Sequence, residues 1–286
     1  MATLNGLTVN GTYLKLPTGT TAQRPGTTAA GQIRMNGNVE EHYTANGWQA
    51  AEKVVADGLQ CHLDAGDPRS YATAIGSPVN GVRWHDISGN NRHFDWVNPP
   101  TVARSGSITW FYTSGNRCVG PASNSFGITQ DYTIFMIFQT KSFNANAGFH
   151  FYSQSTKASG NRAIFIHPGW SNQTLYFDGG GPGTAGLERV QYTFDTQDFY
   201  DWRVWCFRVG NSTRKIYNNG VEYASNSATA VTTLGSAGVD LASDFDYGGD
   251  SSNWNGRLNT FMVYNRGLTA AEVQSNTRVL LRKIGA

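Results

Sequence analysis

The chain has 286 residues, with 22 Lys and Arg against 20 Asp and Glu, which gives a formal net charge of +2. This balance is too weak to indicate a nucleic-acid or anionic-membrane partner, and no apolar run approaches the ~20 residues that span a bilayer. Only 15% of the residues are charged, whereas 13% are aromatic. We therefore expect a sizeable core beneath a surface of uncharged polar side chains.

The first 55 residues are expected to form a segment of their own, because they contain few large apolar side chains. The part from Thr18 to Arg24 is expected to be extended, with backbone N–H groups available to a partner strand. Residues 32–35 and 39–43 flank an Asn-Gly-Asn turn and predict a hairpin. A lone hairpin is marginal in water, so this segment is expected to dock on a partner. The first six residues have no basic or apolar stretch, and we expect no secretory signal.

Short runs rich in β-branched and aromatic residues dominate the remainder of the chain, and Gly, Asn, Ser, Asp or Pro bound each run. These predicted strands occupy residues 108–112, 132–139, 148–153, 162–167, 174–177, 189–194, 202–209, 214–218 and 258–264. Asn219-Gly220 predicts a type I′ hairpin turn, because both residues accept a positive φ. Many short strands with frequent turns predict an all-β jelly-roll sandwich, which we place at residues 56–286.

One helix is predicted near the end of the chain. Thr269 and Glu272 form a capping box, in which each side chain satisfies a free N–H group of the first turn. Apolar residues behind it make a stripe that would dock on the sandwich: Val273, Leu280, Leu281 and Ile284. Three widely separated cysteines lie among apolar residues and are expected to be buried free thiols: Cys61, Cys118 and Cys206.

Two stretches resemble known families. The first is Leu16-Pro17-Thr18-Gly19-Thr20-Thr21-Ala22-Gln23-Arg24-Pro25, followed by residues 31–36 and 43–48. It resembles a recurrent module of tailed-phage structural proteins. The resemblance implies a homotrimer that attaches to the major capsid protein or to another virion protein. The residues expected to make this attachment are Leu16, Pro17, Arg24, Pro25, Ile33, Met35 and Trp48.

The second stretch covers roughly residues 58–285. It is carried by Leu63-Asp64-Ala65-Gly66-Asp67-Pro68-Arg69-Ser70-Tyr71, by Trp84-His85-Asp86-Ile87-Ser88-Gly89-Asn90 and by residues 261–273. It is similar to the concanavalin A-like, laminin-G-like jelly roll, which is common in phage virion proteins. The resemblance implies display on the virion surface after assembly in the host cytoplasm. Within it, Asp86 is expected to accept backbone N–H bonds in an Asx-type turn.

Some concanavalin A-like proteins are glycoside hydrolases, and retaining hydrolysis needs two carboxyls about 5–5.5 Å apart. The chain has six Glu, and none has another acid at i+2 or i+4. We therefore expect a protein that is not an enzyme and assign no catalytic residue. Loop carboxylates for Ca²⁺ are an open alternative, but short Asp side chains also cap turns, so no metal ligand is assigned. The two candidate groups are Asp64 with Asp67, and Asp244 with Asp246 and Asp250.

Two tryptophans in loops are candidates for glycan binding. Trp170 lies beside Asn172, and Trp254 lies beside Asn253. A flat aromatic ring can stack on a sugar while neighbouring amides bind its hydroxyl groups. The alternative is that both rings fold back to cover the ends of the sandwich.

The leading hypothesis is a non-enzymatic virion surface protein. Capsid decoration or a head fibre is favoured over a tail fibre, because the chain contains no repeat and no heptad shaft. The alternative is a tail-fibre or adhesin lectin module that binds host surface glycans. A secreted carbohydrate-active enzyme is disfavoured by the missing carboxylate pair and the missing signal.

Overall fold

The computed structural model describes residues 8–10, 13–15, 18–24, 32–36, 39–44, 47–50, 53–71, 83–98, 100–143, 147–157, 159–179, 188–195, 201–228, 233–244 and 254–285. The chain divides into two compact units, Met1–Lys53 and Val54–Ala286. Val55 is fixed within the second unit, because its N–H donates to Asn276 Oδ1 at 2.7 Å and its carbonyl accepts the Tyr264 hydroxyl at 2.9 Å. The second unit therefore begins two residues before residue 56.

The first unit contains short strands. They are β1 (Thr8–Asn10), β2 (Tyr13–Lys15), β3 (Thr18–Gly19), β4 (Ile33–Asn36), β5 (Val39–Thr44) and β6 (Gly47–Ala50). Strands β1 and β2 pair with each other, and the other four form a sheet in the order β3-β4-β5-β6. The predicted hairpin is present as the antiparallel pair β4 and β5.

The expectation of a continuously extended stretch from Thr18 to Arg24 is wrong. Only β3 is extended, and it already pairs in parallel with β4. A 3-10 turn, η1 (Thr21–Gln23), follows it. The Thr20 N–H donates to Gln23 Oε1 at 2.8 Å, and the Gln23 N–H donates to the Thr20 carbonyl at 3.0 Å. Thr20 and Gln23 thus satisfy each other locally, as capping residues do.

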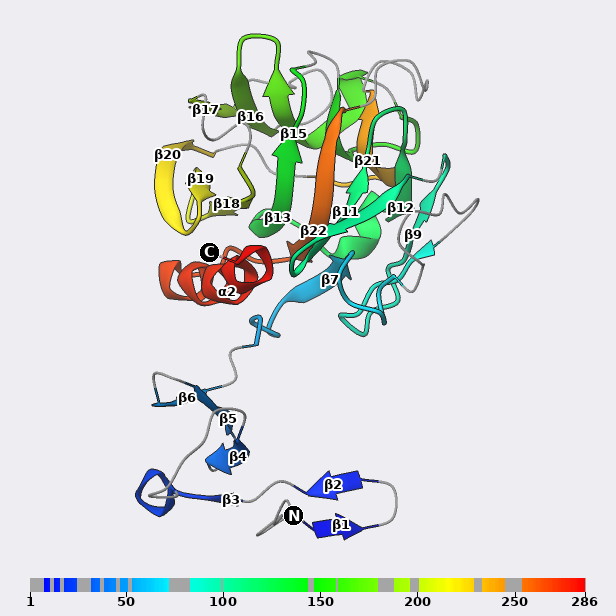
Figure 1. Ribbon diagram of the computed structural model, residues 1–286. Coiled ribbons are helices and arrows are strands. Elements are labelled where there is room, and N and C mark those ends of the chain that lie inside the picture. Colours follow the sequence, from blue (N-terminus) through cyan, green and yellow to red (C-terminus); the bar gives the residue numbers. More distant parts are fainter. Residues whose placement is uncertain are drawn as a thin grey trace. The chain divides into compact units, whose positions relative to one another are not determined.

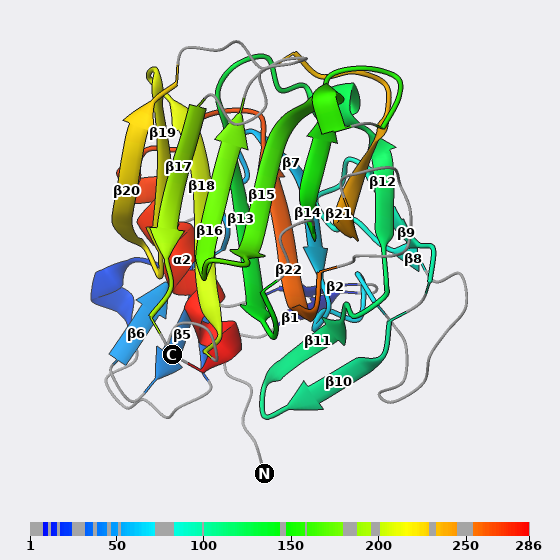
Figure 2. The same cartoon turned by 90° about the horizontal axis from the view of Figure 1, so that it is seen from above.

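Two eight-stranded sheets form the second unit. The first sheet contains β10 (Val102–Ser105), β11 (Ile108–Tyr112), β22 (Gly256–Tyr264), β13 (Tyr132–Thr140), β18 (Arg203–Gly210), β19 (Thr213–Asn218) and β20 (Val221–Ser227) in that order, with β7 (Leu59–Asp64) also paired to β22. The second sheet has the order β17 (Glu188–Thr193), β16 (Thr174–Gly179), β15 (Arg162–Trp170), β14 (Ala147–Tyr152), β21 (Gly238–Asp244), β12 (Cys118–Ala122), β9 (Phe94–Trp96) and β8 (Arg83–Trp84). The architecture is the predicted all-β jelly-roll sandwich, and Figure 2 shows the strands of one sheet crossing in front of the other.

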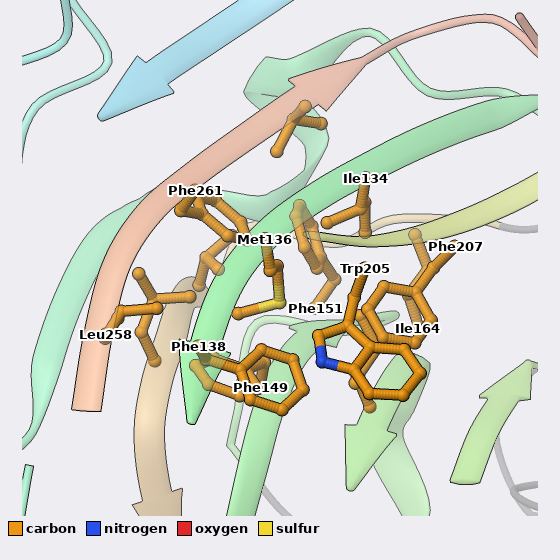
Figure 3. Close-up of a cluster of buried hydrophobic side chains, with 14 of the residues drawn as sticks. Ile134, Met136, Phe138, Phe149, Phe151, Ile164, Trp205, Phe207, Leu258 and Phe261 are labelled. Carbon is orange, nitrogen blue, oxygen red and sulfur yellow. The ribbon is translucent and has the colours of Figure 1, made fainter. Parts of the chain in front are cut away.

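The core lies between the inner faces of the two sheets (Figure 3). Alternate residues of β13, β14, β15, β18 and β22 point into it, as period-two strands require. The labelled side chains are Ile134, Met136, Phe138, Phe149, Phe151, Ile164, Trp205, Phe207, Leu258 and Phe261, and each is at most 1% exposed. Strand β13 is buried on both faces, because its other side chains pack beneath the helix.

The helix α2 (Ala270–Ile284) covers the outer face of the first sheet, as Figure 1 shows. The Glu272 N–H donates to Thr269 Oγ1 at 3.3 Å, and the Thr269 N–H donates to Glu272 Oε2 at 2.8 Å, so the predicted capping box is confirmed. Val273 and Leu280 are fully buried against this sheet. In the part of the chain that the structure describes, no helix is long and apolar enough to cross a membrane.

Three further predictions are confirmed. Asn219 and Gly220 adopt φ values of 48° and 83° between β19 and β20. Asp86 accepts the Ser88 N–H at 2.9 Å and the His62 N–H at 2.8 Å, which ties its turn to β7. The free thiols at positions 61, 118 and 206 are buried.

Candidate functional site

The outer face of the second sheet carries an unusual set of side chains on β15, β16 and β17. Ile164, Ile166 and Phe177 point into the core. Because side chains alternate along a strand, their neighbours point outward. Register places these outward residues in three rows, each crossing the three strands: Trp170, Thr174 and Thr193; His167, Tyr176 and Gln191; and Phe165, Asp178 and Arg189. Figure 2 shows β15, β16 and β17 side by side at one side of this sheet, and the three rows place aromatic, amide, hydroxyl and guanidinium groups on its outer face.

The accessible members of this surface lie along one side. Gln191, Thr193 and Arg189 are exposed on β17, and Trp170 is half-buried at the end of β15. In the described chain, the side chains of Trp170, Gln191 and Thr193 make no hydrogen bond to protein. An aromatic ring, an amide and a hydroxyl are therefore available together for a ligand. We call Trp170, Tyr176, Arg189, Gln191 and Thr193 the Trp170 cluster.

Tyr176 and Asp178 hold the Arg189 guanidinium in place. Arg189 donates to both oxygens of Asp178, with distances of 2.7 Å from Nε and 2.6 Å from Nη2. These bonds raise the pKa of Arg189, and its guanidinium carbon lies 4.1 Å from the centre of the Tyr176 ring. A bidentate pair over an aromatic ring fixes a planar donor, so the arginine presents its outer edge with little freedom.

Trp170 is positioned by its neighbours on the same face. Its ring lies edge to face with His167, at 4.5 Å between centroids, and with Tyr176 at 5.9 Å. Asn172, in the turn that follows, donates through Nδ2 to the Tyr176 hydroxyl at 2.7 Å. The structure therefore places one predicted residue, Trp170, in the cluster and a second, Asn172, in contact with it through Tyr176.

The prediction that Trp254 contacts a glycan is wrong. Its side chain is 0% exposed and packs against Phe138 and Phe149, with ring centroids 5.5 and 5.3 Å away. Gly256 makes room for it, since a Cβ there would lie 2.1 Å from the indole. Burial of the large apolar indole stabilises the fold, so Trp254 lies in the core although its sequence neighbours are typical of an exposed loop. Asn253 lies outside the described residues.

The predicted attachment residues belong to the first unit. Ile33, on β4, is 44% exposed, whereas Met35 on the same strand and Arg24 after η1 are half-buried. Trp48 lies on β6. Three of them lie outside the described residues: Leu16, Pro17 and Pro25. Ile33 therefore offers apolar surface to a partner.

Two of the described carboxylates on the outer face, Asp178 and Asp240, are poorly placed for hydrolysis, and a third, Asp95, forms an ion pair with Arg83 at 2.9 Å. Asp178 and Asp240 lie on one row, separated by Phe165 and His150 on the intervening strands. Three strand spacings separate them by roughly 14 Å, which exceeds the distances that retaining or inverting hydrolases use. Each is also engaged, because Asp178 binds Arg189 and Asp240 accepts Lys157 Nζ at 2.6 Å. This pair therefore cannot act as a nucleophile and an acid on one glycosidic bond.

His150, in the centre of that row, is held neutral. Burial lowers the pKa of His150 well below its usual value, and the nearby Arg162 and Lys157 lower it further. Lys157 lies beside Asp240, which also accepts the Tyr152 hydroxyl at 2.9 Å. The charges of Lys157 and Asp240 thus compensate each other within the chain.

No group of three or more metal-ligating side chains occurs in the described residues. Asp64 and Asp67 already have protein partners: Lys283 Nζ and the Gly66 N–H bind Asp64, and Arg69 Nη2 binds Asp67 at 2.6 Å. A cation there would have to displace a lysine and an arginine. In the other candidate calcium group, Asp244 ends β21, and Asp246 and Asp250 lie outside the described residues.

The outward residues of β16 and β17 were not identified from the sequence as candidate site residues. A signal was present, because Arg189, Gln191 and Thr193 alternate with the apolar residues of a predicted strand. That alternation places them on a solvent face, but only the strand register shows that they lie beside Trp170.

Comparison with known proteins identifies the class. The family model described as the concanavalin A-like lectin/glucanases superfamily matches residues 113–274, more than half of the chain. The chain therefore belongs to the concanavalin A-like lectin/glucanase superfamily. No curated protein sequence matches it.

Several solved structures share the fold. The binding domain of Paraclostridial Mosquitocidal Protein 1 has a TM-score of 0.57 at 15% identity, covering 79% of this chain and 53% of that one. The binding domain of Botulinum Neurotoxin DC in complex with SialylT gives 0.56 at 13% identity, with 79% and 52% covered. Trypanosoma rangeli sialidase gives 0.55 at 12% identity, with 85% and 36% covered. This chain thus spans only about half of the first two chains and about a third of the third. At these identities the likeness establishes the fold alone.

Proposed function

We propose that the second unit is a non-enzymatic carbohydrate-binding domain and that the Trp170 cluster is its binding surface. The observation that carries this proposal is the juxtaposition of a half-buried indole with unbonded amide and hydroxyl side chains and a fixed guanidinium. A sugar presents a flat apolar face and a ring of hydroxyl groups, and these groups match both features.

The solved relatives support a binding role in general. Two of them are binding domains of toxins, and one of these was solved in complex with SialylT. The well-separated and engaged carboxylates of the outer face also favour binding over hydrolysis. The ligand we propose is a glycan of the host cell surface.

The test is binding to an array of immobilised bacterial lipopolysaccharides and capsular polysaccharides. The intact chain is expected to bind a subset of them with micromolar to millimolar affinity, and Trp170→Ala should weaken that binding about tenfold or more, because stacking is lost. Tyr223→Ala is the matched control, since Tyr223 is an aromatic residue 59% exposed on β20, outside the cluster. Equal loss in both variants, or no binding across the array, would contradict the proposal.

We further propose that this domain is displayed on a phage virion, as a capsid decoration or head-fibre protein, with residues 1–55 as a trimeric attachment segment. The resemblance of that segment to a module of tailed-phage structural proteins supports this placement. The exposed Ile33 supplies apolar surface for the major capsid protein, another virion protein or a symmetry mate. Mass spectrometry of purified virions, separated into capsid and tail fractions, tests it. Presence in tails alone would favour the tail-fibre or adhesin role instead.

A further inference from the structure

A pocket lies at one end of the first sheet, away from the Trp170 cluster. The start of β13 pairs there with the ends of β18 and β22. The pocket has a volume of about 430 Å³, and three segments line it: residues 129–131 before β13, residues 211–212 after β18 and residues 265–266 after β22. Its volume lies within the range of about 300–1,000 Å³ that is usual for small-molecule sites.

The wall of this pocket includes four polar side chains that form no hydrogen bond with the described part of the chain. Gln130, Asn211 and Asn265 provide amides, and Ser212 provides a hydroxyl. Among the described residues, none of these four side chains forms a hydrogen bond with protein. Each amide is both a donor and an acceptor, as sugar hydroxyl groups are.

The backbone beneath these side chains is fixed. The Asn265 N–H donates to the Gly58 carbonyl at 3.0 Å. Thr133 Oγ1 donates to the Arg266 carbonyl and accepts the Leu268 N–H, each at 3.0 Å. The carbonyl of Ser212 accepts the Ala228 N–H at 2.9 Å. The backbone that carries Ser212, Asn265 and Arg266 is therefore already ordered before a ligand arrives, so less backbone entropy is lost on binding.

The turn at Asn211 and Ser212 carries the second observation. Both residues have positive φ, 54° and 55°, in the tight turn between β18 and β19. The next hairpin uses Asn219-Gly220 for the same kind of turn, and glycine adopts this conformation without strain. Ser212 therefore keeps a hydroxyl at the pocket although its backbone is strained, and the fold would be more stable with glycine at this position. Strain of this kind concentrates at functional sites.

The charges around the pocket favour a neutral ligand. Asp131 carries a negative charge, and Arg266 is already bound to Glu272 at 2.6 Å and to Asp57 at 2.9 Å. The arginine thus has no unbalanced charge for an anion. A single lining carboxylate is also too little for Ca²⁺, which takes six to eight oxygens.

We propose that this pocket is a second binding site, specific for a neutral saccharide unit. Thr140, at the far end of β13, donates to the Pro168 carbonyl close to Trp170. The two sites are therefore separated by about 25 Å, the length of β13 between them. This separation gives one domain two contacts with a long polysaccharide or a glycan-covered surface, which increases its apparent affinity through avidity. The second site does not depend on the first.

The test is an NMR titration of the intact chain with glucose, galactose, mannose and N-acetylglucosamine, each alone at millimolar concentration. At least one sugar is expected to shift the side-chain amide signals of Asn211 and Asn265. The double variant Gln130→Ala, Asn211→Gly should weaken this response about tenfold, because it removes two amides while keeping the turn. The response should persist in Trp170→Ala, so that failure of the Trp170 cluster and failure of this pocket are distinguishable.

Ser212→Gly supplies a second measurement. It should raise Tm by about 2–4 °C, since the strain is relieved, and should weaken the sugar response in the same protein. The proposal is overturned if no sugar shifts the amide signals, or if the double variant binds as tightly as the parent. A stronger response to glucuronate or glucosamine than to glucose would overturn the neutral class.

Discussion

At the residue scale, the buried position of the Arg214 side chain requires a glycine at position 179. Its side chain is 1% exposed, and its guanidinium lies 4.6 Å from the centre of the Phe177 ring. Glu188 balances its charge at 3.4 Å, and the Tyr132 hydroxyl accepts Nη1 at 3.1 Å. A Cβ on Gly179 would lie 1.8 Å from Nη2 of this arginine. Because position 179 has no side chain, there is room for the buried, charged guanidinium of Arg214.

Gly179→Ala is expected to reduce the free energy of unfolding by about 1–3 kcal/mol, the usual effect of overpacking. Urea denaturation followed by tryptophan fluorescence measures it. Gly160→Ala is the matched control, because no atom lies within 4 Å of a Cβ there. Equal stability of the two variants would show that Arg214 moves aside freely.

The sequence around the two tryptophans did not allow us to predict which of them is exposed and which is buried. Trp170 and Trp254 have similar amide-rich neighbours in the sequence, yet the first borders the outer face and the second is in the core. Gly256 creates the space that the second indole fills, and nothing local distinguishes that glycine from a turn residue. The core position of Trp254 depends on Phe138 and Phe149, more than a hundred residues earlier.

At the scale of elements, local chemistry predicted the helix and nine strands of the sandwich, but not β7, β8, β9, β10, β12, β20 and β21. Runs of aromatic and β-branched residues predicted the strands at residues 132–139 and 202–209 to within one residue at each end. The capping box predicted where α2 begins. The rows of the Trp170 cluster were not predictable in this way, because pairing of β15, β16 and β17 decides which residues become neighbours.

The start of α2 should give the protein an acid-sensitive contribution to stability. Hydrogen bonds from Arg266 lower the pKa of Glu272 from 4.5 to about 2, with further bonds from Thr269 acting in the same direction. A carboxyl whose pKa is lower in the folded state stabilises the fold above its unfolded pKa and loses that effect as pH falls through the folded value. The unfolding free energy is therefore expected to decline between pH 4.5 and about 2.

Glu272→Gln tests this contribution. The variant should be about 1 kcal/mol less stable than the parent at neutral pH, since solvent screens part of the interaction, and the difference should disappear near pH 2. Thermal unfolding across this pH range measures it. A difference that is the same at both ends of the range would mean that the charge of Glu272 does not contribute.

At the scale of the whole molecule, the two units differ in how much structure they hold. The strands of the first unit are two to six residues long, whereas strands of the sandwich reach nine. The first unit has a two-stranded sheet and a four-stranded sheet of such short strands. The sandwich has its own core and its own helix, and Val54 and Val55 pack with the cluster beneath that helix.

A fragment of residues 54–286 is therefore expected to unfold cooperatively as a monomer, with a Tm close to that of the intact chain. If residues 1–55 attach the chain to a virion as proposed, the fragment should keep the proposed glycan binding but fail to join phage particles when supplied during assembly. Calorimetry and quantitative mass spectrometry of the particles provide the two readings. Normal occupancy of the fragment would place attachment on the sandwich instead of residues 1–55.

The central claim, that the Trp170 cluster binds a glycan, is tested most directly by a crystal structure of the chain with the best oligosaccharide from the array. The account predicts a sugar ring stacked on the Trp170 indole, with hydroxyl groups within hydrogen-bond distance of Arg189 or Gln191. A saccharide bound only elsewhere on the domain, with the Trp170 ring uncovered, would contradict it.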